Sequence, residues 1–344
     1  MWLTGEGWAR TMVAWFLCSP HRELRPGSCV KSSLGHHRGL PPATLLPPEL
    51  LAWQSRGSFL RVGPGGHRVY VQSIGAAEAA PAETVLLLHG FPESSFSWSR
   101  NVDALARRFR RVVVLDLLGF GLSDKPLDHS YSLFEQADLV LEAWRQLGVT
   151  GGHVIAHDMG DSVLTELLAR GIRSLLPAWL SGGFVTVTFT DGSMVMHLAK
   201  LRIGQRLLRT RLGPVLGRLG SHRTFTQQVR SASGGPIAQH DIDMMWALLR
   251  HHDGHLVQHR IIRYIDERLR FQDTRWLPAV AATTVPIHLC WGALDRVAPP
   301  AIAEHLKEHV CPSARLTLLP RAGHFCQQED PEAWNEAVLR FYEA

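Results

Sequence analysis

An aspartate stands at the position where a sharp turn would expose a nucleophile. Asp158 follows the apolar run 152–155 and precedes a helix-like stretch at 161–170, with Ala156 and Gly160 two positions to either side. Strand, tight turn and helix with small flanking residues form the turn that holds a reactive side chain above a sheet. A carboxylate there would attack carbon and form an alkyl ester, which water must then cleave. The alternative is an aspartate that caps the following helix.

A second motif lies at the end of an earlier apolar run. The segment 89–92 reads His-Gly-Phe-Pro and closes the run 84–88. In proteins built around such a turn, this loop donates one backbone N–H to a developing oxyanion, and the residue after the nucleophile donates the other. The two donors would be Phe91 and Met159. Taken alone, the segment could be only a turn.

An acid and a histidine follow in the order that completes a triad. Asp295 comes after the apolar strand 286–292, and His324 comes just past the strand 316–319. Asp295 would orient His324 and stabilise its charge, and His324 would activate the hydrolytic water. Asp295 alone could begin a loop, and His324 is one of nineteen histidines. The four motifs occur in the expected chain order, each at the end of an expected strand. Open parallel sheets bind ligands at that end of their strands, so the motifs together indicate one site.

Strands and helices alternate along most of the chain. The alternation predicts a mostly parallel sheet with helices on both faces. It stops after residue 183, and residues 184 to about 276 read as helices without strands. The expected strands lie at 84–89, 111–116, 153–157, 175–181, 287–291 and 316–319, and the expected helices at 95–107, 133–147, 161–170, 300–310 and 331–343.

The chain resembles the epoxide hydrolase and haloalkane dehalogenase branch of the α/β-hydrolases. The resemblance runs from about residue 50 to the C terminus, and the segment 131–137 narrows it to one subfamily. It implies an α/β-hydrolase fold with an inserted helical cap, and hydrolysis through an alkyl-enzyme ester with no cofactor and no metal. The matching segments are Leu86–Pro92, Leu115–Pro126, Tyr131–Ala137, His157–Asp161, and Asp253-Gly254 followed by Leu256-Val257.

The expected organisation has three parts. Residues 1–48 would form a variable or disordered leader, residues 49–183 and 277–344 the α/β-hydrolase core, and residues 184–276 the helical cap. Caps of this kind exclude water and shape specificity. No run approaches the ~18–20 apolar residues of a membrane span. The resemblance implies a location at the endoplasmic reticulum membrane, and the cytoplasm would be expected otherwise.

Two positions depart from the patterns of this branch. Epoxide hydrolases hold the opening epoxide with a pair of cap tyrosines, whereas only Tyr264 falls in the expected cap. Haloalkane dehalogenases hold the halide with side chains at the positions of Phe91 and Met159, neither of which donates a hydrogen bond here. The catalytic residues can therefore be carried over, but the substrate cannot. The candidates for lining the substrate pocket are His89, Trp98 and Tyr264.

Much of the net charge of +5 is concentrated in the expected cap, where residues 192–240 contain no acidic residue. The simplest interpretation is a solvated face of amphipathic helices. The alternative is attraction to anionic lipid headgroups or to an acidic substrate. No motif indicates nucleic-acid binding, and the five cysteines show no metal spacing. The basic residues are Lys200, Arg202, Arg206, Arg209, Arg211, Arg218, Arg223 and Arg230.

Two functions of different classes follow from these residues. The leading one is an epoxide hydrolase-like enzyme that uses Asp158 as nucleophile on a small apolar or lipid-like substrate. The second is a catalytically idle hydrolase fold that binds a lipid or a partner protein. The missing leaving-group donors favour the second function. The presence of Asp158, Asp295 and His324 together favours the first, because an idle site needs no triad.

Overall fold

An eight-stranded sheet forms the centre of the chain that the computed structural model describes, residues 46–343. The strand order is β1-β2-β4-β3-β5-β6-β7-β8. The first two strands run antiparallel to their neighbours, and all pairs from β4 onward are parallel. The strands are β1 (Ser58–Val62), β2 (His67–Gly75), β3 (Thr84–Leu88), β4 (Arg111–Leu115), β5 (Gly151–His157), β6 (Gly183–Thr190), β7 (Ile287–Gly292) and β8 (Arg315–Leu319).

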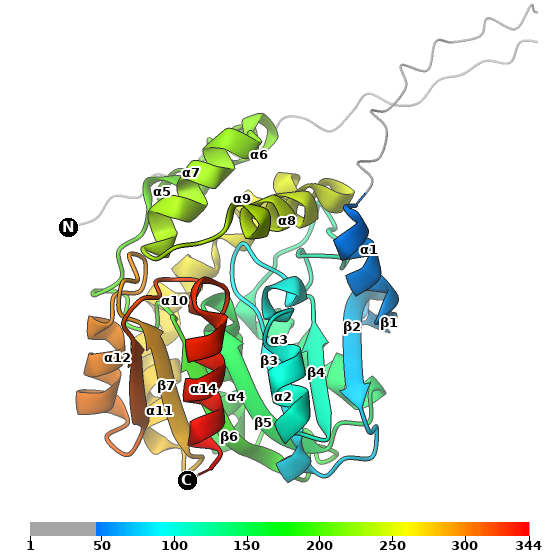
Figure 1. The fold of residues 1–344 in the computed structure, drawn as a ribbon, viewed down its shortest axis with the longest axis vertical. Helices are drawn as coiled ribbons and strands as arrows, with labels where there is room; N and C mark the ends of the chain where they lie inside the picture. The colour runs from blue at the N-terminus through cyan, green and yellow to red at the C-terminus, as the bar shows by residue number, and fades with distance from the viewer. Residues whose placement is uncertain (1–45, 344) are drawn as a thin grey trace, which may run out of the picture. The chain divides into compact units, whose positions relative to one another are not determined.

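Helices cover both faces of the sheet, as Figure 1 shows. Successive residues of a strand point to opposite faces, and β3 accordingly sends Leu86 and Leu88 into one apolar cluster and Val85 and Leu87 into another. The first cluster includes residues of α3 (Leu133–Gln146), α4 (Met159–Ile172) and α11 (Leu277–Ala282). The second includes residues of α1 (Pro48–Ser55), α2 (Val102–Arg108) and α14 (Pro331–Phe341). The expected α/β-hydrolase fold is confirmed.

The sixth strand lies later in the chain than expected. The strand predicted at 175–181 is wrong, because that segment contains Pro177 and forms no strand, whereas β6 spans Gly183–Thr190. Valine, threonine and phenylalanine alternate along β6, which is a strand pattern. Residues 184–190 therefore belong to the sheet, between β5 and β7, and the chain leaves the sheet at Thr190 rather than at residue 183.

Residues 191–286, here called the helical insertion, connect β6 to β7. Because β6 ends at Thr190, the insertion starts from the carboxyl edge of the sheet, and Figure 1 shows α5 to α9 beyond that edge. Among the described residues, no helix has the length and apolar character needed to cross a membrane. The helices are α5 (Ile203–Leu208), α6 (Gly213–Leu219), α7 (His222–Ser233), α8 (Gln239–Arg250), α9 (Gln258–Ile261), α10 (Tyr264–Phe271) and α11.

The remaining elements lie at the two ends of the described chain. The leader expected at residues 1–48 falls outside the described residues up to position 45, and α1 begins at Pro48. After β7, α12 (Ala301–His305) precedes β8, and α13 (Cys326–Glu329) follows it. The loops after β5, β7 and β8 thus end up at the same edge of the sheet, where candidate residues from distant parts of the chain meet.

Candidate active site

Asp158 occupies a strained turn between β5 and α4. Its φ of 45° and ψ of −103° place it in a region that non-glycine residues rarely adopt. The turn is tight, since a Cβ on Gly160 would lie 2.6 Å from the Leu88 carbonyl oxygen, and one on Gly90 would lie 2.7 Å from the Asp158 Cβ. Strain of this kind persists where the surroundings over-determine it, as they do at active sites.

The two carboxylate oxygens of Asp158 have different surroundings. Oδ2 accepts hydrogen bonds from the Phe91 backbone N–H at 3.1 Å and from the Tyr264 hydroxyl at 3.3 Å. Oδ1 is buried and has no hydrogen-bond partner among the described residues. Met159, the second expected backbone donor, is buried as the first residue of α4. One carboxylate oxygen is therefore held by two donors, and the other has no hydrogen bond.

Asp295 and His324 lie in contact at the same edge. The His324 Nδ1 is 2.9 Å from the Asp295 Oδ2, and both side chains are buried. The other carboxylate oxygen, Oδ1, accepts from the backbone N–H groups of Val297 at 2.6 Å and Ala298 at 2.9 Å. These bonds fix the carboxylate, and the carboxylate orients the imidazole.

The charge on His324 depends on its two acidic neighbours. Burial opposes the protonated form, but the Asp295 and Asp158 carboxylates outweigh it and raise the pKa of His324 to about 10. Burial also opposes the charged form of Asp158, while the Arg268 guanidinium and the imidazoles lower its pKa below the ordinary value. At neutral pH the site therefore holds an ionised Asp158 beside a protonated His324.

A buried arginine also contacts the nucleophile candidate. Arg268 of α10 donates from Nε to the Ser162 hydroxyl and from Nη2 to the Asp158 carbonyl. Its Nη1 lies 3.6 Å from the Asp158 Oδ1. Sequence reasoning missed Arg268, although it stands four residues after Tyr264, a spacing that puts both side chains on one face of a helix.

A third buried carboxylate stands near the histidine. Asp191 directly follows β6, and its Oδ1 accepts from the Gly292 backbone N–H at 2.8 Å. Burial and the neighbouring Asp295 raise the pKa of Asp191 well above its ordinary value. The misplacement of β6 hid this residue, because an aspartate at the carboxyl end of a parallel strand is otherwise a site candidate.

A buried pair, Glu93 and His157, supports the histidine loop. The His157 Nδ1 contacts the Glu93 carboxylate, and its Nε2 donates to the His324 carbonyl oxygen at 2.7 Å. Burial disfavours a charged imidazole, but the adjacent Glu93 outweighs it and raises the pKa of His157. Both residues directly adjoin the two motifs, Glu93 after Pro92 and His157 before Asp158, and this adjacency was the available signal.

Glu93→Gln should lower the free energy of unfolding by about 3 kcal/mol, because it leaves a buried imidazolium without its partner. Chemical denaturation measures the change. The matched control is Glu142→Gln, which removes a solvent-exposed pair with Arg145 and should change the free energy of unfolding far less. Equal losses in the two variants would contradict the structural role of the buried pair.

Two of the pocket candidates are engaged elsewhere. His89 accepts at Nε2 from the Leu117 backbone N–H at 3.0 Å, so its Nδ1 carries the proton shared with the Gly90 carbonyl at 2.9 Å. Trp98 is fully buried in the core and packs against Trp334, with ring centroids 5.4 Å apart. Of the three candidates, the structure brings only Tyr264 into hydrogen-bond contact with Asp158.

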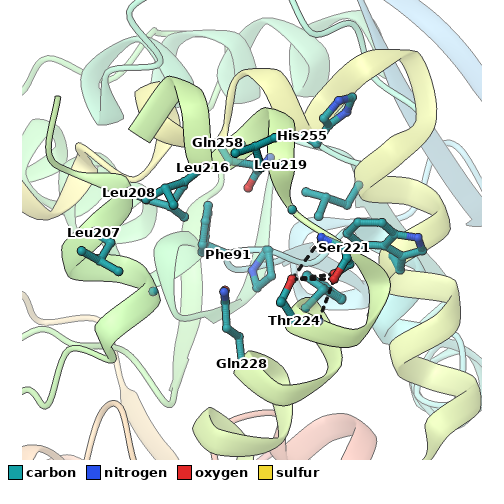
Figure 2. A pocket seen from close by; sticks show the side chains of 17 residues that line it. Phe91, Leu207, Leu208, Leu216, Leu219, Ser221, Thr224, Gln228, His255 and Gln258 are labelled. Carbon is teal, nitrogen blue, oxygen red and sulfur yellow. Dashed lines mark hydrogen bonds between the residues drawn. The ribbon is translucent and has the colours of Figure 1, made fainter. Parts of the chain in front are cut away.

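A cavity of about 240 Å³ lies between the Phe91-Pro92 loop and the helical insertion (Figure 2). Phe91 joins the cavity to the site, since its side chain lines the cavity while its backbone N–H binds Asp158. The lining is mostly apolar, as in sites for apolar ligands. Its apolar residues include Leu207, Leu208, Leu216, Leu219, Phe225, Trp246 and Leu249, and its polar ones Ser221, Thr224, Gln228, His255 and Gln258.

The fold and the residues at the sheet edge define an α/β-hydrolase. The chain matches the alpha/beta hydrolase fold family over residues 83–331 and belongs to that family. It is 40% identical over 295 residues to the putative hydrolase LipZ of Mycobacterium tuberculosis, covering 85% of this chain and 97% of the relative.

The expected resemblance to the mesoderm-specific transcript protein is also confirmed. The chain is 34% identical over 310 residues to the human mesoderm-specific transcript homolog protein, covering 87% of this chain and 90% of that protein. Among solved structures, an α/β-hydrolase fold protein from Burkholderia ambifaria matches with a TM-score of 0.66 at 24% identity, over 82% of this chain and 97% of that one.

A haloalkane dehalogenase loop variant from Bradyrhizobium elkanii also matches, with a TM-score of 0.65 at 21% identity, over 83% of this chain and 96% of that one. The similarity to these solved structures concerns the fold alone. Together the comparisons make the protein a hydrolase of the α/β-hydrolase superfamily, and they assign it no substrate.

Proposed function

We propose that this protein is a hydrolase with an aspartate nucleophile, acting through an alkyl-enzyme ester on a small apolar or lipid-like substrate, in the manner of an epoxide hydrolase. The observation that carries the proposal is the asymmetry of Asp158. One oxygen is held by a backbone N–H and by the Tyr264 hydroxyl, and the other is buried without a hydrogen bond. A helix cap alone would leave this arrangement unexplained.

In the first step, Asp158 Oδ1 attacks a carbon of the epoxide. A new C–O bond forms, the ring C–O bond breaks, and the leaving oxygen takes the electron pair. The Tyr264 hydroxyl is already at the site and can turn from Oδ2 to that oxygen. The carboxylate charge disappears as the ester forms.

In the second step, water attacks the ester carbonyl carbon of Asp158. The loss of the Asp158 charge removes one of the carboxylates that hold His324 protonated, so the pKa of His324 falls. Its proton passes to the alkoxide oxygen left by the first step, and the neutral imidazole can then act as a base. His324 then takes the proton of water and returns it to the departing alcohol oxygen as the acyl C–O bond breaks. The Phe91 backbone N–H supports the oxyanion that forms between these events.

The helical insertion would act as the cap, and the cavity beneath it would hold the apolar part of the substrate. The cavity begins at Phe91, which adjoins Asp158, and continues between α5, α6, α7 and α8. An apolar chain entering it would leave a reactive carbon near the site. The alternative of a catalytically idle lipid binder shares this cavity but gives no reason for the Asp295–His324 contact of 2.9 Å.

A substrate panel tests the proposal. Epoxides with an alkyl chain should be hydrolysed, matched alkyl bromides and acyl esters should be turned over at least about tenfold more slowly, and Asp158→Ala should abolish the epoxide activity. The haloalkane expectation rests on Phe91 and Met159, whose side chains cannot donate to a halide. Epoxide turnover that survives Asp158→Ala would refute the nucleophile.

The outer surface of α5 and α6 supports a membrane-facing role for the insertion. Ile203 and Val215 are 76% and 51% exposed, and the exposed arginines Arg206, Arg211 and Arg218 lie near them in the sequence. Apolar side chains interspersed with cations fit an anionic lipid surface. We propose that the protein binds such a surface, which fits the endoplasmic reticulum location implied by the resemblance.

Vesicle binding measures this association. The protein should co-sediment with phosphatidylcholine vesicles that contain phosphatidylserine, and salt should weaken the binding because the Debye length shortens. The double variant Ile203→Ser, Val215→Ser should lose most of the bound fraction. Leu127→Ser is the matched control, since Leu127 is also exposed but lies outside the insertion. Equal binding of the two variants would exclude this surface as the contact.

A further inference from the structure

Two of the three guanidinium nitrogens of Arg268 donate hydrogen bonds, and the third has no hydrogen-bond partner among the described residues. Nε and Nη2 donate to the Ser162 hydroxyl and the Asp158 carbonyl, so the planar group is fixed against the turn. Nη1 is buried and has no hydrogen-bond partner among the described residues. A buried donor without a partner is uncommon and needs an explanation.

The nearest acceptor to this nitrogen is the reactive oxygen itself. Nη1 lies 3.6 Å from Asp158 Oδ1, which is also buried and has no hydrogen bond. The distance is too long for a hydrogen bond but within the range of an ion pair. A buried donor and a buried acceptor without hydrogen bonds therefore lie side by side at the turn.

Alkylation of Asp158 would leave the positive charge of Arg268 without its negatively charged partner. The ester is neutral, so the guanidinium loses its counter-ion in a buried position, which is costly. The negative charge that forms during attack is the one on the leaving oxygen.

We propose that Arg268 is a second leaving-group donor, acting beside Tyr264 on the oxygen that departs from the attacked carbon. The inference rests on the proposed function. As the ring C–O bond breaks, the electron pair moves to the leaving oxygen, and the Arg268 Nη1 and the Tyr264 hydroxyl both donate to it.

The geometry of α10 presents these two donors together. Tyr264 and Arg268 are four residues apart on one helix, and the Arg268 guanidinium carbon lies 4.8 Å from the Tyr264 ring centroid. Each side chain contacts a different oxygen of Asp158. The pair therefore presents two donors to Asp158 from one face of α10.

The test isolates the first half-reaction in the His324→Gln background, where the ester is expected to accumulate. Adduct formation on Asp158 is followed by intact-protein mass spectrometry. The substrates are 1,2-epoxyoctane and its 3,3-difluoro analogue, whose fluorines make the leaving alkoxide less basic. A less basic oxygen needs less help from a cation, so the two epoxides separate leaving-group stabilisation from general damage.

Arg268→Gln should slow adduct formation by epoxyoctane ~10²–10³-fold and by the difluoro analogue ~10-fold or less. Arg268→Lys keeps a cation without the fixed fork, so its loss should be smaller but still greater for epoxyoctane. If the Arg268→Gln variant does not fold, the comparison of the two epoxides is made with the Arg268→Lys variant. Thermal unfolding monitors both variants.

Equal slowing of the two epoxides, or no slowing of either, would overturn the role of Arg268 while leaving the proposed function intact. Absence of any adduct with Arg268 in place would overturn the proposed function and this inference with it. Tyr264→Phe is the reference variant, since it should show the same preference for the less basic leaving group.

Discussion

His324→Gln is expected to stop turnover and leave a covalent ester on Asp158. The attack by Asp158 Oδ1 needs no base, whereas the release of the ester needs His324 to take a proton from water. Glutamine can hold a water molecule but cannot accept its proton at neutral pH. Turnover should fall by at least about 10⁴-fold, comparable to removal of the base in other triads.

Peptide mass spectrometry of the variant after incubation with an alkyl epoxide measures this outcome. The mass of the substrate should appear on the peptide that contains Asp158 and on no other. The double variant Asp158→Ala, His324→Gln should carry no adduct. An adduct on another residue, or residual turnover near the wild-type rate, would show that a different nucleophile does the chemistry.

The sequence predicted the fold well where strands are buried on both faces. Such strands read as continuous apolar runs, and the expected positions at 84–89, 111–116, 153–157 and 287–291 overlap the buried strands β3, β4, β5 and β7. The position expected at 316–319 also overlaps β8, which is only partly buried. The helix expected at 133–147 matches α3 within one residue. Motifs at the ends of these strands placed Asp158, Asp295 and His324 at one edge of the sheet.

The sequence pattern misplaced β6, a strand rich in threonine that follows a leucine-rich turn. Threonine at every second position made β6 look less like a core strand than the leucine-rich segment before it, although Pro177 argued against a strand there. The error carried over to Asp191, which then fell in the expected cap instead of at the end of a strand.

Contacts between distant segments were beyond any local pattern. Arg268 and Asp158 are 110 residues apart, and Glu93 meets His157 across the space between β3 and β5. Burial makes such pairs important for stability. Removing one partner of a buried ion pair leaves the other charge unpaired in the protein interior, whereas the same loss at the surface costs little. Only the three-dimensional arrangement identifies which arginine among many is buried.

Asp295→Asn is expected to block ester hydrolysis while sparing ester formation. The asparagine can still accept from the Val297 and Ala298 backbone N–H groups through one oxygen, so its NH₂ group would face His324 Nδ1. Nδ1 must then accept, which leaves the proton on Nε2, and the imidazole can no longer take one from water. Single-turnover kinetics should show hydrolysis slowed ~10³–10⁴-fold and alkylation slowed less than ~10-fold.

Asp191 limits how far Asp295→Asn slows ester hydrolysis. The Asp295 charge is one reason that the pKa of Asp191 is raised, so neutralising Asp295 favours ionisation of Asp191 beside the same histidine. Asp191→Asn alone should therefore keep hydrolysis within about tenfold of wild type, and the double variant should be slower than Asp295→Asn, because neighbouring sites that share a partner are not additive. If Asp191→Asn alone abolished hydrolysis and Asp295→Asn did not, the acid of the triad would be Asp191.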